Sequence, residues 1–416
     1  MAACFWQCAA RTSASRESAA ARWWKGNTHT HTLWSDGDAA PEIAALWYRE
    51  HGYHFLVLSD HNVLSRGERW FEVKEGTAAR LNPQRVNEIR SRFGDGWLVE
   101  REVEGRPQMR LKTLEELRHE FEEVDAFLLI EGEEITSDFE KKPVHVNGLN
   151  LAEPVPPQTG ASVREVMQKA IDAVIDQGTR FSRPVLAHLN HPNFHYAVSV
   201  DDVAAIDGEH FFEVYNGHGR VENYGDASHL STEAMWDQAL ALRLREGRPI
   251  LFGLATDDAH NYFTMITGHS NPGRGWIMVR AAELTAAAIL AAMHAGDFYA
   301  SSGVSIEDLR ADGNGLVVAI DSEEGVSYVT RFIGTRADGA PGQALLETLE
   351  NPARYSFRGD EVYVRATVVS TRPHPNPYRK GDFECAWVQP VLGPAARSGG
   401  PFANQSGASH RTPKGQ

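Results

Sequence analysis

Residues 55–62 have the sequence FLVLSDHN, in which four apolar residues are followed directly by Ser59, Asp60, His61 and Asn62. A short, nearly continuous apolar run is typical of a parallel strand that is covered on both faces. The same unit recurs at 127–134 (FLLIEGEE), 184–191 (PVLAHLNH), 211–216 (FFEVYN) and 249–260 (PILFGLATDDAH). Each run therefore predicts a strand that ends in polar or ionisable side chains.

Helices are predicted between these runs. Residues 41–51 begin with a proline, which suits a first helical turn, and Ile43, Leu46 and Trp47 recur at helical spacing. Further helices are expected at 162–177, 232–246 and 285–295, and Gly178 and Gly247 are expected to end the first two. The alternation of strands and helices over 23–301 predicts an α/β fold of the parallel barrel type, in which strand carboxyl ends build the active site.

Other segments depart from this alternation. Residues 64–123 form a charged, mostly helical insertion, and we expect either a lid over the site or a solvated helical excursion. Short alternating segments separated by Gly, Pro and Asn predict an antiparallel β-sandwich over 302–392. The segments 1–22 and 393–416 are small, polar and without periodicity, which predicts disorder.

Composition limits the possible partners. Lys and Arg number 41 against 56 Asp and Glu, a net charge of −15, and no basic run occurs. Duplex nucleic acid is therefore not expected, because binding it depends on neutralising phosphates. No apolar stretch reaches the length of a transmembrane helix, and Cys4, Cys8 and Cys385 are too few for a disulfide framework. The sequence does not define the oligomeric state.

The beginning of the chain bears on its localisation. Met-Ala-Ala-Cys resembles the end of a lipoprotein cleavage site. We hypothesise a leader upstream of Met1, which would make the protein secreted or a lipoprotein; without such a leader it would be cytoplasmic.

Nine residues at or beside the predicted strand ends could ligate metal ions. Imidazole and carboxylate together suit Zn, Mn or Fe, and nine such groups exceed what one ion needs. His29 and His31 flank one residue on an extended segment, so both rings point to the same side. The set predicts a site for two or three divalent ions, and hence a metal-dependent hydrolase. Its members are His29, His31, Asp36, His61, Glu134, His145, His191, Asp258 and His260.

The motifs HTHTLWSDG, LSDHN, GEEIT, VHVNG, HPN and DDAH occur in this order between residues 25 and 304. They resemble those of the polymerase-and-histidinol-phosphatase (PHP) superfamily. The resemblance implies a distorted (β/α)₇ barrel with a trinuclear metal site and, usually, phosphoester hydrolysis. It fits Glu134 better than Glu133 and His191 better than His188, and both alternatives stay open. By motif, one ion is assigned to His29, His31, Glu134 and Asp258, a second to Glu134, His145 and His191, and a third to Asp36, His61 and His260.

Three residues are candidates for catalysis. Glu134 can bridge two ions through its two oxygens, and a hydroxide bridging the ions would attack phosphorus. Asp60 could orient the water or protonate the leaving group, or alternatively fix the His61 ring. Arg274, on a glycine-flanked loop, could clamp two phosphate oxygens, or could be an ordinary exposed loop arginine.

The leading interpretation is therefore a metal-dependent phosphoesterase that acts on a small phosphoester or a similar anionic substrate. One alternative keeps the metal site but hydrolyses a carbamate or carboxylic ester. Another is a non-catalytic, metal-stabilised binding module whose β-sandwich docks carbohydrate or protein.

Overall fold

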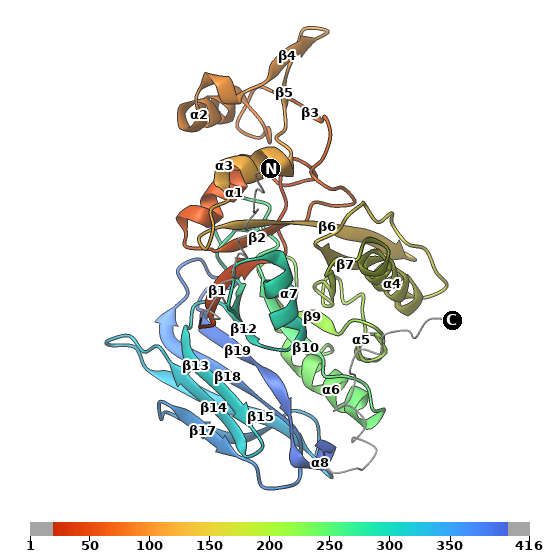
Figure 1. Ribbon diagram of the computed structural model, residues 1–416, viewed down its shortest axis with the longest axis vertical. Helices are drawn as coiled ribbons and strands as arrows, with labels where there is room; N and C mark the ends of the chain where they lie inside the picture. The colour runs from red at the N-terminus through yellow and green to blue at the C-terminus, as the bar shows by residue number, and fades with distance from the viewer. Residues whose placement is uncertain (1–19, 398–416) are drawn as a thin grey trace, which may run out of the picture.

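The computed structural model describes residues 20–397 (Figure 1). The predicted disordered ends lie outside the described residues, except for 20–22 and 393–397. Arg22 already belongs to strand β1, and Pro394–Arg397 form the short helix α8, so regular structure extends slightly beyond both expected boundaries.

Thirteen strands form one large sheet that runs through most of the molecule. Four neighbouring pairs are parallel, namely β1 with β2, β2 with β6, β8 with β9 and β9 with β10. In spatial order the strands are β10 (Phe252–Thr256), β9 (Phe211–Asn216), β8 (Leu186–Leu189), β7 (Lys142–Leu149), β6 (Leu128–Phe139), β2 (Phe55–Leu58), β1 (Arg22–Asn27), β11 (Trp276–Ala281), β12 (Phe298–Ser301), β19 (Phe383–Leu392), β18 (Glu361–Pro373), β15 (Tyr328–Arg336) and β16 (Gln343–Thr348).

The sheet is mixed, so the expectation of an all-parallel arrangement is wrong, and a closed, hydrogen-bonded barrel is not shown among residues 20–397. β6 and β7 form an antiparallel hairpin in which Glu140 and Lys141, both with positive φ, make a two-residue turn. Positive φ at both turn residues matches the right-handed twist of the two strands. β7 is also antiparallel to β8, and β11 to β1 and β12. β10 lies beside β11 and β12, but no hydrogen-bonded ladder joins it to them within residues 20–397.

Helices pack on this curled sheet much as expected. α4 continues past Gly178, because the missing side chain lets the helix approach Val185, and it ends at Ser182 in a left-handed conformation. Gly247 follows the end of α6 with positive φ, as predicted. The helices are α1 (Pro41–Glu50), α4 (Val163–Phe181), α5 (Val200–Ala204), α6 (Thr232–Arg245) and α7 (Ala286–His294).

A central apolar cluster fixes the curvature of the sheet. Phe55, Phe211 and Phe252 from three strands meet Ile289 and Met293 of α7. Burying each such side chain contributes roughly 1.5–3 kcal/mol to stability. A second cluster packs α4 and α6 against the sheet. This packing holds the carboxyl ends of the strands in fixed positions.

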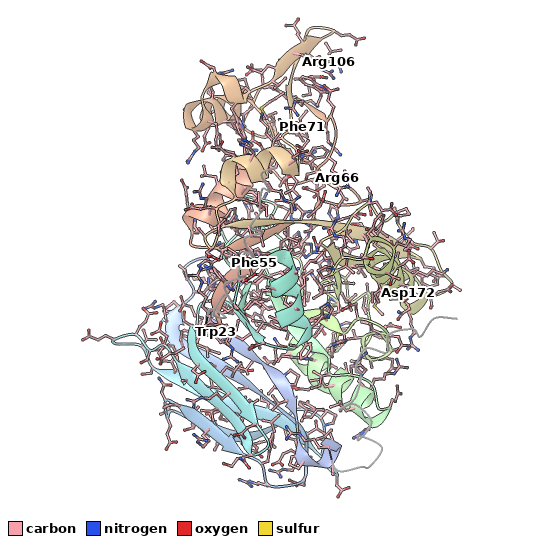
Figure 2. All side chains as sticks on the ribbon, in the orientation of Figure 1. Trp23, Phe55, Arg66, Phe71, Arg106 and Asp172 are labelled. Carbon is pink, nitrogen blue, oxygen red and sulfur yellow. The ribbon has the colours of Figure 1, made fainter. Side chains whose placement is uncertain are left out.

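The insertion is not mostly helical, contrary to the sequence-based expectation. It contains a three-stranded antiparallel sheet in the order β3-β5-β4. Glu104 and Gly105, both with positive φ, form a two-residue turn between β4 and β5. Phe71 and Arg106 mark this unit at the top of Figure 2. Its elements are β3 (Trp70–Glu72), α2 (Pro83–Phe93), the 3₁₀ helix η1 (Asp95–Trp97), β4 (Glu100–Val103), β5 (Arg106–Arg110) and α3 (Leu114–Phe121).

The C-terminal region contains two antiparallel sheets packed face to face, as the alternating pattern predicts. One is the end of the large sheet from β19 to β16, joined to the rest where Tyr299 of β12 pairs with Val388 of β19. The sequence did not indicate β13 or β16. The second sheet has the order β13-β14-β17, with β13 (Ile306–Asp312), β14 (Gly315–Ile320) and β17 (Ala353–Ser356).

Candidate metal centre

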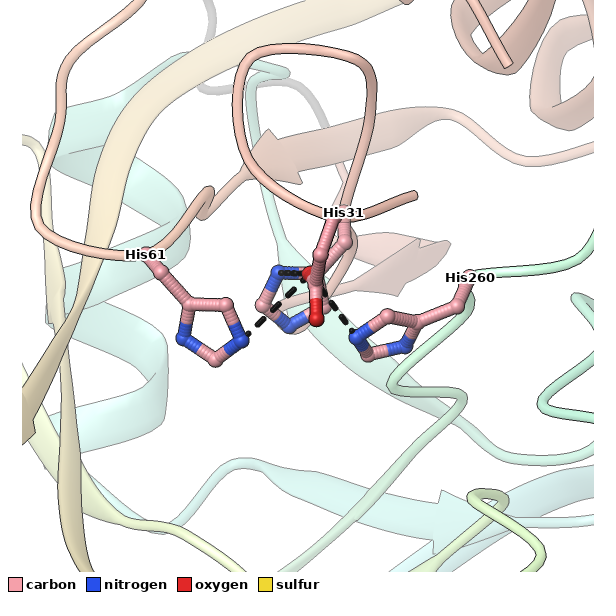
Figure 3. A group of neighbouring side chains, drawn as sticks. His31, His61 and His260 are labelled. Atoms are coloured by element: carbon pink, nitrogen blue, oxygen red, sulfur yellow. Dashed lines mark ion pairs between the residues drawn. The ribbon is translucent and has the colours of Figure 1, made fainter. Parts of the chain in front are cut away.

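The nine predicted ligands converge at the carboxyl ends of the parallel strands. Each belongs to at least one of four groups whose ligand atoms lie within 4.8 Å of one another. The groups are His31, Asp36, His61 and His260; His29, His191 and Asp258; His29, His31 and Glu134; and Glu134, His145 and His191. Figure 3 shows His31, His61 and His260 directed at one carboxylate, that of Asp36.

His29 and His31 lie side by side because the chain stays extended beyond β1. Thr30 forms an isolated parallel bridge with Ala259 and accepts a hydrogen bond from the Ser59 amide. The residues on either side of Thr30 therefore point to the same face of the strand. Their Nε2 atoms are 3.1 Å apart.

Glu134 is the central carboxylate of the site and is fully buried. Its Oε1 lies 2.9 Å from His145 Nδ1, 3.2 Å from His191 Nε2 and 3.4 Å from His29 Nε2. Its Oε2 lies 3.3 Å from His31 Nε2 and 2.7 Å from His61 Nδ1. Glu134 therefore joins residues that the motif pattern assigns to three different ions.

The two alternatives left open by the sequence occupy different places. Glu133 points to the other face of β6, where its Oε2 accepts a hydrogen bond from the Val155 amide. His188 is buried beside His29, with ring centroids 6.4 Å apart, and neither ring nitrogen has a hydrogen-bond partner. The structure thus places Glu134 and His191, not Glu133 and His188, among the converging ligand atoms.

The donors fit divalent cations. Glu134 Oε2 and Asp258 Oδ1 are buried and make no hydrogen bond of acceptable geometry, although imidazole nitrogens lie near both. Leaving buried carboxylate oxygens without partners is costly, and a cation among them would remove that cost. The mixture of imidazole and carboxylate is the one that Zn, Mn and Fe favour.

The charges of these groups depend on one another. Burial raises the pKa of Glu134 and Asp258, but facing imidazoles outweigh this and lower both pKa values well below the usual range. In turn, burial lowers the pKa of His29 while the carboxylates of Asp258, Glu213 and Glu134 raise it well above 6.5. The same balance raises the pKa of His61 to about 11. Metal binding must displace these imidazole protons, so it is coupled to proton release.

Glu213 supports the site and was missed by the sequence analysis. It is a fully buried acid of β9 whose Oε1 lies 2.7 Å from His29 Nδ1 and accepts a hydrogen bond from Thr256 Oγ1. Its Oε2 accepts from the backbone amide of His191 and from Asn216 Nδ2. Such a partner fixes the orientation and tautomer of a ligating histidine. A single acidic residue inside the apolar run FFEVYN was the available signal.

Asp60 does not reach the converging atoms and does not hold the His61 ring. Its Oδ1 accepts hydrogen bonds from the Thr32 amide and from Ser35 Oγ, and its Oδ2 accepts from Thr32 Oγ1. His61 Nδ1 instead lies 2.5 Å from Thr136 Oγ1. Asp60 therefore shapes the loop that follows His31.

Arg274 is also placed differently from the expectation. It is fully buried rather than on an exposed loop, and its guanidinium donates to the backbone carbonyls of Gly217, His269, Ile266 and Asn376. It does not line the cavity at the ligands. Arg274 therefore joins several loops through hydrogen bonds, and its N–H groups point to these loops and not to a substrate.

A cavity of about 70 Å³ opens at the ligands and is also lined by Phe194, His218 and Arg220. His218 Nδ1 accepts a hydrogen bond from the Arg220 amide. Burial lowers the pKa of His218 to about 3, so the ring is neutral and carries its proton on Nε2. Arg220 is exposed, with its guanidinium carbon 5.8 Å from the centre of the Phe194 ring. These are the polar groups available to a substrate at the mouth of the cavity.

No protein-family model and no curated protein sequence matches the chain. Solved structures that are similar to it include two at 14% identity. One is a two-domain protein from Bacteroides vulgatus containing a predicted PHP-like metal-dependent phosphoesterase; it matches 92% of this chain and all of the other, with a TM-score of 0.42. The other is a candidate metal-dependent phosphoesterase from Bifidobacterium adolescentis; it matches 56% of this chain and 87% of the other, with a TM-score of 0.28.

Proposed function

We propose that this protein is a metal-dependent phosphoesterase that hydrolyses small phosphoesters at a site holding two or three divalent ions. The observation that carries the proposal is the arrangement around Glu134, where five imidazoles approach one buried carboxylate. When bound there, such ions lower the pKa of water to about 7 and neutralise charge on phosphoryl oxygens. The nine converging residues are the proposed ligands.

The chain's own residues account for substrate recognition in this proposal. Arg220, at the mouth of the cavity, offers a guanidinium that can pair with phosphate oxygens. The Nε2 proton of His218 is a neutral hydrogen-bond donor to the same anion. Because the cavity is about 70 Å³, it suits a phosphoryl group whose organic part stays outside. Arg220 thus takes the role that the sequence analysis assigned to Arg274.

A substrate panel tests the type of bond. Purified protein is incubated with Mn²⁺ or Zn²⁺ and with phosphomonoesters, phosphodiesters, carbamates and aryl carboxylic esters. The proposal expects turnover of phosphoesters that chelation abolishes and added metal restores. Turnover of carboxylic esters or carbamates without turnover of any phosphoester would contradict it and favour the rival hydrolase.

The recognition role of Arg220 has its own test. Arg220→Met removes the guanidinium but keeps an unbranched side chain, and we expect KM for a phosphoester to rise about tenfold, as for the loss of one charge-assisted hydrogen bond. Arg331→Met, an exposed arginine of the C-terminal sheet paired with Glu347, serves as the matched control. Unchanged KM in Arg220→Met would remove Arg220 from the site.

A further inference from the structure

Asp36 differs from the other eight proposed ligands because it lies far from any strand end. They lie on a strand or within a few residues of the end of one, whereas Asp36 lies on a loop nine residues past the end of β1. Its side chain is 57% exposed. Its Oδ1 is nevertheless held 3.2 Å from His260 Nε2 and 3.5 Å from His61 Nε2. Because packing around the exposed side chain does not fix the position of Asp36, the conformation of the loop backbone must do so.

The insertion supplies two arginines to that loop. Arg80 Nη1 donates to the carbonyl of Ser35 at 2.7 Å and to that of Gly37 at 3.3 Å, on either side of Asp36. Arg85 Nη1 donates to the carbonyl of Asp38 at 2.7 Å, and its Nη2 lies 3.5 Å from Asp38 Oδ2. Both guanidiniums are themselves held against aromatic rings, Arg80 over Phe71 and Arg85 over Phe263.

Apolar packing joins the same two parts of the molecule. Leu33 and Trp34 are buried in a cluster whose other members include Leu81, Val86 and Met109 of the insertion. Trp34 Nε1 donates to the carbonyl of Lys112 at 2.9 Å. None of the residues that line the cavity comes from 64–123. The insertion therefore contacts the site from behind the loop and does not cover its mouth.

We infer that the insertion is a support for the metal site: Arg80 and Arg85 hold the 35–38 loop so that the outer group of His31, Asp36, His61 and His260 is preformed for a cation. This inference rests on the proposed function, because it concerns metal affinity at the same site. Gly37 is consistent with a loop of fixed shape, since a Cβ there would lie 2.6 Å from the carbonyl oxygen of His31. Arg80 and Arg85 are positioning residues, and they act through the loop backbone.

Co²⁺ titration followed by visible absorbance and metal analysis tests the inference. Arg80→Met keeps an apolar stem against Phe71 but removes the donors to Ser35 and Gly37. We expect one class of ion to bind about tenfold more weakly, as for loss of an outer-shell partner, while the remaining ions bind as before. Asp36→Asn should weaken the same class, and Arg80→Lys, which keeps a donor, should recover part of the affinity.

Arg101→Met is the matched control, because Arg101 also lies over a ring, that of Trp70, but its guanidinium donates to Gln108 of the insertion and not to the 35–38 loop. Wild-type protein that binds no metal would refute the proposed function. Wild-type protein that binds two or three ions with the same affinities as Arg80→Met would refute the present inference alone.

Hydrogen exchange gives a second, independent test of the inference. Coupling between two sites is reciprocal, so a cation in the outer group must stabilise the insertion by the amount that the insertion stabilises the cation. Hydrogen exchange of the wild-type protein should therefore slow when metal is added at the amides of Gly37, Asp38 and residues 80–86 other than Pro83. Asp36→Asn should lose this protection. Protection confined to strand ends, with exchange at 80–86 unchanged, would overturn the inference.

Discussion

Glu209 and Glu213 are buried acids only four residues apart, one just before β9 and the other within it, yet their environments give them different charge states. Burial raises the pKa of Glu209 to about 8, and its Oε2 has no hydrogen-bond partner. Burial also raises the pKa of Glu213, but His29, His188 and His191 outweigh it and bring the pKa to about 2. Glu209, just before β9, is neutral at pH 7, and Glu213, inside β9, is an anion.

The comparison explains why a metal centre is proposed at only one end of the sheet. Burial by itself makes a carboxylic acid neutral, and a neutral acid does not attract a cation. At the carboxyl end, imidazoles from several strands keep the carboxylates ionised and supply neutral ligands once their protons leave. At the amino end Glu209 faces His294 alone among the ion pairs of the described residues, at 3.8 Å. The location of the proposed metal centre therefore depends on side chains from several strand ends, and one buried acid does not define it.

The largest effect is expected from removing the central carboxylate. Glu134→Gln keeps the shape of the side chain but removes the charge that five imidazoles share. We expect kcat/KM for a phosphoester to fall at least about a thousandfold, equivalent to ~4 kcal/mol of transition-state stabilisation. Glu209→Gln is the matched control and should leave kcat/KM within about a factor of two. Equal losses of kcat/KM in Glu134→Gln and Glu209→Gln would contradict a special role for the carboxylate at the carboxyl ends of the strands.

A smaller loss is expected when Glu213 is changed. Glu213→Gln preserves a hydrogen-bond acceptor for His29 Nδ1 but removes the negative charge. We expect metal affinity and kcat to fall about 10–100-fold, the usual range for the partner of a ligating histidine. Titration of metal into the variant and into wild-type protein measures the difference. Wild-type affinity in Glu213→Gln would show that the carboxylate only fills space.

The smallest expected effect is a dependence of stability on pH. The folded-state pKa of Glu209, about 8, lies above its ordinary value of 4.5, so the folded protein binds an extra proton between these pH values. The stability from Glu209 is fully present below pH 4.5 and is lost as pH rises through 8. Relative to Glu209→Gln, wild-type protein should lose on the order of 3 kcal/mol between pH 5 and pH 8, at about 1.4 kcal/mol per pKa unit.

Urea unfolding of both proteins at pH 5, 6.5 and 8 gives this difference directly. The metal-free proteins should be used, because bound ions add their own dependence on pH. A difference that is constant over this range would mean that Glu209 is ionised in the folded state at pH 5.

Much of the molecule follows from local sequence patterns. Apolar runs such as 211–216 locate buried strands, and an ionisable residue two or three positions after a strand can reach the common carboxyl end, as His61 and Asp258 do. β4 and β5 were missed because they are rich in charged residues, and β16 because most of its residues are exposed, so no buried apolar run marks these strands. The mixed pairing depended on the two-residue turn at Glu140 and Lys141, which carries neither glycine nor asparagine.

The residues that the sequence misplaced depend on contacts between distant segments. Arg274 is surrounded by glycines, which suggested an exposed loop, but it is buried through contacts that include Asn376, 102 positions away. Asp60 follows a strand like a ligand, yet Thr32 and Ser35 use both of its oxygens. The spacing of residues in the sequence does not show which polar side chains are already hydrogen-bonded to a distant segment.

No helix among the described residues combines the length and apolarity needed to cross a membrane. The proposed metal centre depends on one buried cluster of carboxylates and imidazoles. Anomalous X-ray diffraction from crystals of the wild-type protein grown with Mn²⁺ or Zn²⁺ tests it most directly. We expect two or three anomalous peaks among Glu134, Asp258 and the surrounding imidazoles, with Glu134 in contact with more than one. Absence of peaks there, or a peak only beside Glu209 and His294, would contradict the proposed metal centre.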